Sequence, residues 1–544
     1  MFVYLHCYMP ETWEAQIKAG LVRPGDGIRF SQSIDIEENL KFNNLARLDG
    51  ELYNYIREHK CPLYIDRLQG GCFLEEYPYD MELINEYRTL LGDKFWGFQM
   101  HEWVSNFRSD LIKIISNNCP EWTVKAITET IHRAFPFEHT FLEAMNAEEY
   151  AALGGKPENY KQHINILRDL FQKRQNYVNG DLLPCDSWLP APKLEIELGA
   201  KRLMPEIGAQ TRNTRIQIAY ARGMARASGI PFGAYYEPWG GDPLSAFCYH
   251  REGKNEWNVS SESFPYQAVG ENGGSSRSMQ MRMHLYTYMA GGSFFAEEWG
   301  MCNTFYDWKK FELSPYGQIK KYFLDFVDRY PNIGKPIVPV AVVLPKDMLV
   351  LDMNLTSGTY LEYPIEGHFA KVCSDIVDTL NYLFVESAPM LGSETINLLN
   401  YLTPDAIDII HEDSRTVDDY PILIDCTGNP DFATAHKENI KSLNDVRDLM
   451  NDYLPIRLEG GASMQITKNA ETGEQYVLVM NNSGVIRTIE EGEILMPEGE
   501  INVSLTMKNG ESLCQLEGNG SIVKKEENNY QLSIPSGGWF FAKF

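Results

Sequence analysis

The sequence predicts an α/β protein in which a closed (β/α)₈ barrel, or TIM barrel, precedes a smaller α/β unit and an antiparallel β-sandwich. Strand-like and helix-like stretches alternate over residues 1–335, which is typical of a parallel sheet. Several of these strands end in a glutamate beside aromatic residues. Residues 456–544 instead alternate polar and apolar positions between glycine-rich turns, which favours a β-sandwich.

A closed barrel of this type needs eight strands, and eight segments qualify. The fourth is followed by a helix-rich insertion at about residues 106–180. The fifth predicted strand is short, and the numbering of the later strands depends on it. Without this strand, each later strand would be numbered one lower. The predicted strands are residues 2–7, 27–34, 62–68, 95–103, 182–187, 203–208, 232–239 and 293–300, and the later helices are residues 213–227, 275–290 and 316–330.

Beyond the barrel, residues 331–339 are proline-rich and predict a linker. The second unit, residues 336–455, contains three predicted strands and two predicted helices, while residues 456–544 form the third unit. The predicted strands of the second unit are residues 340–344, 406–410 and 420–425, and its helices are residues 370–385 and 439–453.

Composition restricts the partners. With 44% apolar residues the 544-residue chain can bury large cores, and a net charge of −26 without a basic stripe argues against nucleic acid. No apolar run approaches the roughly 20 residues that span a bilayer, so no membrane partner is expected. The first residues lack a signal-peptide pattern, which predicts a cytoplasmic protein, or a secreted one whose leader has been removed. Ten dispersed cysteines without Cys-x-x-Cys predict buried thiols rather than disulfides.

The segment Phe-Trp-Gly-Phe-Gln-Met-His-Glu-Trp, residues 95–103, reads as an apolar strand that stops on Glu102. A general acid needs a carboxyl whose pKa is raised by apolar walls, and Phe98, Met100 and Trp103 are its neighbours in sequence. We therefore predict that Glu102 is catalytic, the alternative being a structural salt bridge. The segment is not a zinc-protease motif, because the second histidine is absent.

Glu237, in Tyr-Tyr-Glu-Pro-Trp-Gly, ends the seventh predicted strand. Carboxylates on strands four and seven can face each other about 5 Å apart, the spacing of an acid/base and a nucleophile in a retaining glycosidase. Glu237 is therefore the predicted nucleophile, and a carboxylate that binds substrate or orders a loop is the alternative. Glu298 competes for this role and would take it if the fifth strand were absent.

Other strand-end residues are predicted to bind substrate. Adjacent side chains on a strand point to opposite faces, so at most one of Glu297 and Glu298 points fully into the barrel mouth. Aromatic rings there would stack on sugar rings, although aromatics are mostly core residues. The predicted binding residues are His101, Glu206, Glu297, Asp66, Arg67, Gln99, Tyr235, Trp239 and Trp299, with an ordinary ion pair as the alternative for Asp66 and Arg67. No phosphate-, dinucleotide- or calcium-binding motif is present, and neither a metal nor a cofactor is implied.

The order of the three units resembles that of the family-42 β-galactosidases and related clan A glycoside hydrolases. The family's fourth strand ends in Asn-Glu, which residues 97–102 resemble with His101 in place of the asparagine, and the strand of its nucleophile is similar to residues 232–241, which favours Glu237 over Glu298. The resemblance implies a catalytic barrel, a flavodoxin-like middle domain that resembles a glutamine amidotransferase without its activity and helps trimer assembly, and a β-sandwich. His101 in place of asparagine and an acidic eighth strand indicate a divergent sister family.

The sequence therefore predicts a retaining, β-galactosidase-like exo-glycosidase that acts on carbohydrate and forms a homo-oligomer through its middle domain. Two alternatives stay open at this point. One is an inverting hydrolase that uses Glu102 with Glu206 or Glu298. The other is a protein without catalytic activity that binds carbohydrate or serves in assembly.

Overall fold

The computed structural model describes most of the chain. The described residues are 2–8, 10–30, 50–65, 81–134, 147–186, 189, 191–208, 214–238, 275–298, 304–306, 309–349, 359–360, 363–364, 367–384, 405–486, 491 and 493–544.

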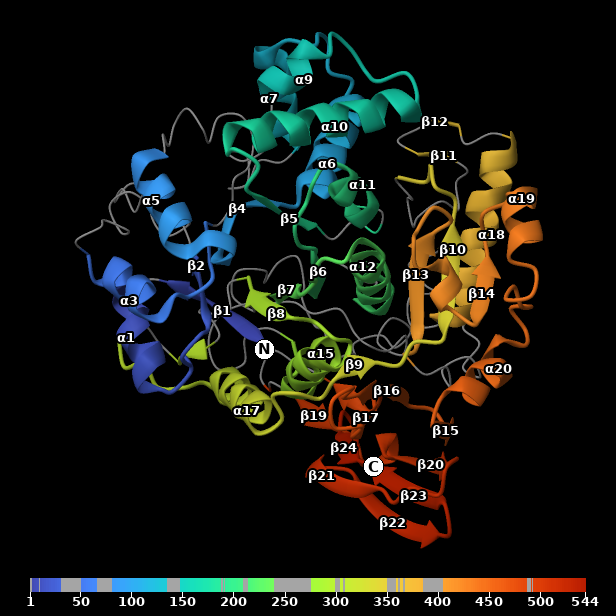
Figure 1. Cartoon of the computed structure of the whole chain (residues 1–544). Helices are drawn as coiled ribbons and strands as arrows, with labels where there is room; N and C mark the ends of the chain where they lie inside the picture. The colour runs from blue at the N-terminus through green and yellow to red at the C-terminus, as the bar shows by residue number, and fades with distance from the viewer. Residues whose placement is uncertain are drawn as a thin grey trace.

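Eight parallel strands form a closed barrel in which each strand pairs with the next in the chain and β8 pairs with β1 (Figure 1). The predicted barrel is thereby confirmed, and its fifth strand is real. The strands are β1 Val3–Tyr8, β2 Gly27–Phe30, β3 Leu63–Ile65, β4 Phe95–His101, β5 Leu182–Asp186, β6 Met204–Gly208, β7 Ala234–Glu237 and β8 Phe294–Glu297.

Several helices of the outer ring are amphipathic, with apolar positions that recur every three or four residues. In α3, for example, Leu52 and Ile56 lie one turn apart and are both buried. In α17 the Ser314 side chain accepts a hydrogen bond from the Gly317 amide, which fixes where the helix begins. None of the described helices is long and apolar enough to cross a bilayer. The ring helices are α1 Pro10–Lys18, α3 Glu51–His59, α5 Met81–Leu91, α11 Ala191–Glu197, α12 Thr214–Ser228, α15 Arg277–Met289 and α17 Pro315–Arg329.

Among the described residues, four further helices lie between β4 and β5, in the upper part of Figure 1. They are α6 Trp103–Ser116, α7 Val124–Ala134, α9 Ala147–Ala152 and α10 Tyr160–Tyr177. The fourth strand was predicted to run to residue 103, but it ends at His101, and Trp103 is the first residue of α6.

The middle unit is built on a parallel sheet in the order β13-β10-β14, at the right of Figure 1. Its elements are β10 Val340–Leu344, β11 Thr359–Tyr360, β12 Tyr363–Pro364, α18 Gly367–Leu383, β13 Ile407–His411, β14 Ile422–Asp425, α19 Pro430–Ala435 and α20 Val446–Tyr453. The last helix begins at Val446, later than predicted, because residues 439–441 pair with Leu423 of β14 instead. Within the described part the parallel sheet has three strands, so the flavodoxin-like fold stays a prediction, as does assembly through this unit.

The C-terminal unit contains antiparallel sheets of four and five strands that share one hydrophobic core, so the predicted β-rich ending is confirmed. One sheet has the order β15-β20-β23-β22 and the other β21-β24-β17-β16-β9. The strands are β9 Lys335–Pro336, β15 Ile456–Glu459, β16 Ser463–Lys468, β17 Gln475–Met480, β18 Val485–Ile486, β19 Ile494–Leu495, β20 Ile501–Met507, β21 Cys514–Gly518, β22 Ser521–Glu526, β23 Asn529–Ile534 and β24 Trp539–Lys543.

Strand β9 corrects the prediction of a simple linker. Lys335 and Pro336 pair antiparallel with β16 and extend the edge of the five-stranded sheet. A proline is tolerated at an edge because the missing amide is not needed for a further ladder bond. The segment after the barrel is thus part of the C-terminal sheet before the chain enters the middle unit.

The C-terminal unit also covers α15, the helix between β7 and β8. Arg282 donates from Nη1 to Asn482 Oδ1 at 2.7 Å, and the Ser278 amide donates to Glu493 Oε2 at 2.7 Å. Gln465 donates to the backbone carbonyl of Tyr286 at 3.1 Å. Twelve of the thirteen residues of α15 are buried as a result, so this barrel helix has no solvent-exposed face.

Helix α12 joins the barrel to the middle unit by packing on β13. Arg222 donates from Nε to Asp408 Oδ1 at 2.5 Å, and Asp408 also accepts from the Tyr420 hydroxyl at 2.7 Å. The helix approaches β13 so closely that a Cβ at Gly223 would lie 2.4 Å from the Ile409 carbonyl oxygen. A buried ion pair in such an interface is destabilising when only one partner is removed.

We expect Arg222→Met to lower the free energy of unfolding by on the order of 3 kcal/mol, because it leaves the Asp408 carboxylate buried beside Tyr420 alone. Urea titration followed by circular dichroism measures this. The control is Arg226→Met on the same helix, whose 3.5 Å pair with Asp419 has 40% and 55% exposed side chains. A solvent-exposed pair contributes about 0–1 kcal/mol, so equal effects of the two variants would contradict the prediction.

His411, at the end of β13, is held neutral in this interface. Its Nδ1 lies 2.7 Å from the Pro345 carbonyl, which only accepts, so Nδ1 carries the proton and Nε2 accepts from the Tyr220 hydroxyl at 2.5 Å. Burial lowers the pKa of His411 from 6.5 to about 4; the Pro345 carbonyl opposes this shift, and Lys193 adds to it.

The His411 pKa predicts how stability changes with pH. Between pH 6.5 and about 4, His411 binds a proton in the unfolded chain but not in the folded chain. The free energy of unfolding therefore falls as the pH falls, by about 3 kcal/mol over this window. We therefore expect the stability difference between the parent and His411→Asn to be largest near neutral pH and to shrink toward pH 4. Urea titrations at several pH values, with His436→Asn as the control, test this. Parallel curves for the parent and His411→Asn would refute it.

Candidate active site

The interior of the barrel is apolar at its base and polar at the carboxyl ends of its strands. Leu5, Tyr64, Trp96 and Phe294 belong to the buried cluster that fills the barrel. Leu183, Met204, Tyr235 and Ala296 belong to the same cluster, and since side chains alternate along a regular strand, the residues two positions after them also face inward, at the end where barrel enzymes carry their active sites. The polar residues that reach this end are Gln99 and His101 from β4, Cys185 from β5, Glu206 from β6, Glu237 from β7 and Glu298 after β8.

A bulge at Gly97 sets which residues of β4 face inward. Gly97 has φ +88°, a left-handed conformation, and the pairing with β3 slips by one residue there. A Cβ at this position would lie 2.0 Å from the Asp181 carbonyl oxygen, so only glycine fits. Before the bulge Trp96 points into the barrel; after it, Phe98 and Met100 pack outward among the helices.

Glu102 lies at the turn between β4 and α6. Its φ is 44°, and its amide donates to the Cys185 carbonyl at 2.7 Å. The predicted apolar walls of Glu102 are wrong, because the Gly97 bulge turns Phe98 and Met100 outward and Trp103 packs against Phe171 of α10. Glu102 is instead half-buried and lies beside other carboxylates.

Two buried acids hold the start of α6 in place. Asp186 accepts from the Val104 amide at 2.6 Å, and Glu195 accepts from the indole of Trp103 at 3.1 Å. Burial raises the pKa of Glu195 to about 8, although the Trp103 hydrogen bond opposes the shift. Because these contacts fix the residues directly after Glu102, they also fix its backbone.

Three glutamates from three parts of the barrel converge. One carboxylate oxygen from each of Glu102, Glu206 and Glu237 lies within 4.8 Å of the others, and Glu206 and Glu237 are fully buried. Burial raises the pKa of Glu206 well above its ordinary value, and the nearby charges of Glu237 and Glu102 raise it further. Such a group of carboxyls can divide the roles of proton donor and nucleophile.

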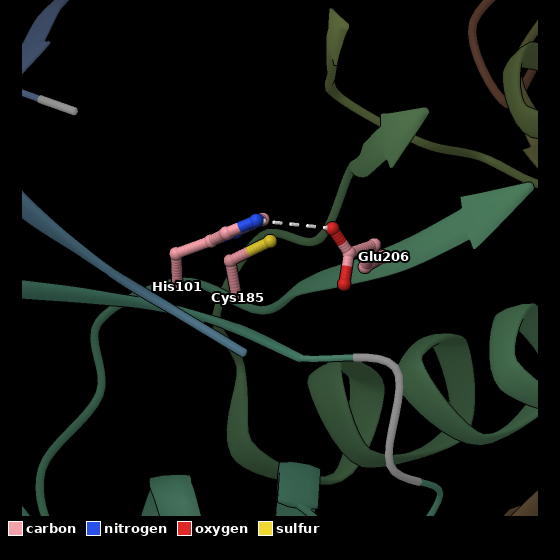
Figure 2. Close-up of side chains that lie close together, drawn as sticks. All are labelled: His101, Cys185 and Glu206. Atoms are coloured by element: carbon pink, nitrogen blue, oxygen red, sulfur yellow. Dashed lines mark ion pairs between the residues drawn. The ribbon is translucent and has the colours of Figure 1, made fainter. Parts of the chain in front are cut away.

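His101 lies between two of the acidic side chains. Its Nε2 is 3.4 Å from Glu206 Oε1 and 3.3 Å from Glu298 Oε1. His101, Cys185 and Glu206 point toward one another from adjacent strands (Figure 2), and one donor atom of each lies within 4.8 Å of the others. Glu298 thus belongs to the same group as Glu206, because both carboxylates approach the same ring nitrogen of His101.

Glu297 faces away from this group, so its predicted substrate contact is wrong. Its carboxylate accepts from Lys320 Nζ at 3.0 Å and from the Tyr316 hydroxyl, and His284 Nε2 lies 3.2 Å away. Burial alone would raise the pKa of Glu297, but Lys320, His284 and Tyr316 together hold it below its ordinary value. These partners come from α15 and α17, which places Glu297 between the barrel and its outer helices.

The remaining predicted residues have mixed positions. Gln99 is fully buried, and neither its amide nitrogen nor its amide oxygen has a hydrogen-bond partner among the described residues. The Tyr235 ring lies inside the barrel, 5.3 Å from the His101 ring, and is too deeply buried to be an open stacking face. The predictions for Asp66, Arg67, Trp239 and Trp299 lie outside the described residues.

Sequence reasoning missed two residues of the barrel interior, Cys185 and Arg29. Arg29 of β2 is buried with its guanidinium 5.0 Å from the centre of the Tyr235 ring, and it donates to the Glu297 carbonyl. A lone arginine in the short strand Gly-Ile-Arg-Phe was a usable signal, because an arginine is rarely fully buried without a partner. Cys185 gave none, since a cysteine in an apolar strand is usually a core residue.

Comparisons with known proteins leave the family open. No protein-family model and no curated protein matches the sequence. Among solved structures, α-L-fucosidase isoenzyme 2 from Paenibacillus thiaminolyticus is similar over 99% of this chain and 98% of its own, with 11% identity and a TM-score of 0.46. A polyextremophilic β-galactosidase from the Antarctic haloarchaeon Halorubrum lacusprofundi is similar over 100% and 99%, with 9% identity and a TM-score of 0.43. These scores are too low to assign the chain to either family.

Proposed function

We propose that the protein is a retaining glycoside hydrolase in which Glu102 is the acid/base and Glu237 is the nucleophile. The observation that carries the proposal is the approach of these two side chains: carboxylate oxygens of Glu102 and Glu237 lie within 4.8 Å at the carboxyl end of a (β/α)₈ barrel. Retaining enzymes hold the two carboxyl groups roughly 5–5.5 Å apart, whereas inverting enzymes need roughly 6.5–9.5 Å for a water molecule.

In the first step Glu237 attacks the anomeric carbon while Glu102 gives its proton to the departing glycosidic oxygen. The bond to the leaving group breaks as a glycosyl ester forms on Glu237. In the second step Glu102, now a carboxylate, takes a proton from water, whose oxygen attacks the anomeric carbon and releases Glu237. The sugar leaves with its original anomeric configuration.

Burial and the nearby charges of Glu237 and Glu102 favour the neutral form of Glu206, so Glu206 is less suited than Glu237 to act as the nucleophile. The inverting alternatives are less well supported. Carboxylate oxygens of Glu102 and Glu206 also lie within 4.8 Å of each other, which is shorter than the roughly 6.5–9.5 Å that inverting enzymes need for a catalytic water. Glu298 is next to His101, whose approach suits a positioning role.

We propose a β-galactoside as the first substrate to test, because residues 97–102 and 232–241 resemble the strand-four and strand-seven segments of the family-42 β-galactosidases. The experiment is a screen of aryl glycosides that covers several sugars in both anomeric forms. For any substrate that is cleaved, NMR of the first-formed sugar anomer distinguishes retention from inversion. An inverted product would refute the mechanism, and a parent protein that binds a glycan without cleaving any substrate would favour the binding alternative.

A further inference from the structure

We propose that His101, Cys185 and Glu206 form a binding site for a divalent transition-metal ion, with zinc as the expected metal. The three side chains come from the neighbouring strands β4, β5 and β6, and each is at most 3% exposed. Their donor atoms converge on one point inside the barrel, as Figure 2 shows for the imidazole, the thiol and the carboxylate.

The spacing of the donor atoms fits metal coordination better than direct hydrogen bonding. His101 Nε2 lies 3.4 Å from Glu206 Oε1, and the Cys185 sulfur lies within 4.8 Å of both atoms. An N–H···O bond to a carboxylate is usually about 2.7–2.9 Å long. In a tetrahedral zinc site with bonds of about 2.0–2.3 Å, the ligand atoms are roughly 3.3–3.8 Å apart. Side-chain shifts of about 1 Å would bring the sulfur to this spacing.

The donor set selects the class of metal. Imidazole nitrogen and thiolate sulfur suit zinc and its neighbours, whereas magnesium and calcium prefer sites made of oxygen. Three protein ligands leave a fourth tetrahedral position open for water or a substrate oxygen. Glu298, with Oε1 3.3 Å from His101 Nε2, is a further carboxylate beside this position.

A second observation concerns the surroundings of the sulfur. Gln99 is fully buried on the same face of β4 as His101, and neither its amide nitrogen nor its amide oxygen has a hydrogen-bond partner among the described residues. An amide N–H directed at a metal-bound thiolate is a typical outer contact that stabilises its charge. A divalent cation here would also offset the repulsion among the buried carboxyls of Glu206, Glu237 and Glu298.

The metal site does not depend on the proposed hydrolysis. Glu102 and Glu237 are not among its three ligands, although Glu206 belongs to both groups. Metal content is measured without any substrate, so either inference can fail alone. A zinc-free protein that hydrolyses glycosides would refute only the metal site. A zinc-bound protein that cleaves nothing would refute only the hydrolase.

The test uses the full chain, purified, treated with a chelator and reloaded with Zn²⁺ or Co²⁺. We expect about one zinc ion per chain by elemental analysis after removal of free metal. With Co²⁺ we expect a thiolate-to-cobalt charge-transfer band in the near ultraviolet. The variant Cys185→Ser should lose that band, and His101→Gln should lower zinc occupancy at least tenfold at a limiting metal concentration.

Cys426→Ser is the matched control, because Cys426 is also a buried thiol but lies in the middle unit beside Thr379. It should keep both the zinc and the band. Circular dichroism verifies that each variant is folded. If Cys185→Ser does not fold, the zinc occupancy of His101→Gln still tests the site. The proposal is overturned if the reloaded parent holds no zinc, or if folded Cys185→Ser and His101→Gln bind metal as the parent does.

Discussion

Replacing Glu237 with glutamine should lower kcat on an activated aryl glycoside by about 10⁴-fold or more, because the neutral amide cannot form the glycosyl ester. The variant should stay folded, since glutamine has nearly the same shape, although burial of Glu237 makes a check of its thermal unfolding necessary. Initial rates with the most reactive substrate found in the glycoside screen measure the loss. Glu298→Gln is the comparison that decides the assignment, because Glu298 also lies at the carboxyl end of the barrel.

Chemical rescue sharpens this test. In Glu237→Gly, azide can occupy the space of the lost carboxylate and attack the anomeric carbon from the same side. The product should be a glycosyl azide whose anomeric configuration is opposite to that of the substrate. If Glu298→Gln abolished turnover while Glu237→Gln retained it, the nucleophile would be Glu298 and the proposed roles would have to be exchanged.

Replacing Glu102 with glutamine should have the second large effect, and the effect should depend on the leaving group. A poor leaving group needs a proton from Glu102, so we expect kcat/KM to fall by about 10²–10⁴-fold for an alkyl or unactivated aryl glycoside. A dinitrophenyl glycoside leaves without protonation, so its kcat/KM should change little. The comparison of the two substrates in parent and variant gives the result directly.

The pH profile and rescue by azide supply the controls for Glu102. Loss of the acid should remove the basic limb of the kcat/KM profile, which reports the free enzyme's proton donor. Azide added to Glu102→Ala should give a glycosyl azide with the same anomeric configuration as the substrate, the opposite of the Glu237→Gly product. An equal loss for both leaving groups would show that Glu102 is not the acid.

The barrel could be predicted from the sequence because each strand is a short apolar run between amphipathic helices, even in the short fifth strand. Strand β9 could not be predicted, because it consists of only two residues and its partner strand β16 lies more than 100 residues later in the chain. The middle sheet followed from the same alternation of strand and helix. The complete fold of the middle unit could not be predicted in the same way. It depends on the order of the strands within the sheet, which the alternation of strand and helix along the sequence does not give.

The convergence of Glu102, Glu206 and Glu237 could be anticipated from their positions at the ends of barrel strands. The surroundings of Glu102 could not be anticipated, because the bulge at Gly97 shifts the inward and outward alternation of side chains by one residue. In the sequence, Gly97 does not differ from a glycine in a regular strand. The position of Cys185 beside His101 was equally hidden, because neighbours across parallel strands are set by register.

The covered helix α15 means that the C-terminal unit is not a modular attachment. A chain that stopped before residue 456 would leave the apolar outer side of α15 in water and would deprive Arg282 of the Asn482 amide oxygen. This helix connects the strand that carries Glu237 to the strand that precedes Glu298. Grafting a foreign domain in place of the C-terminal sheets would therefore change the packing behind the strands next to Glu237 and Glu298, far from the surface that was exchanged.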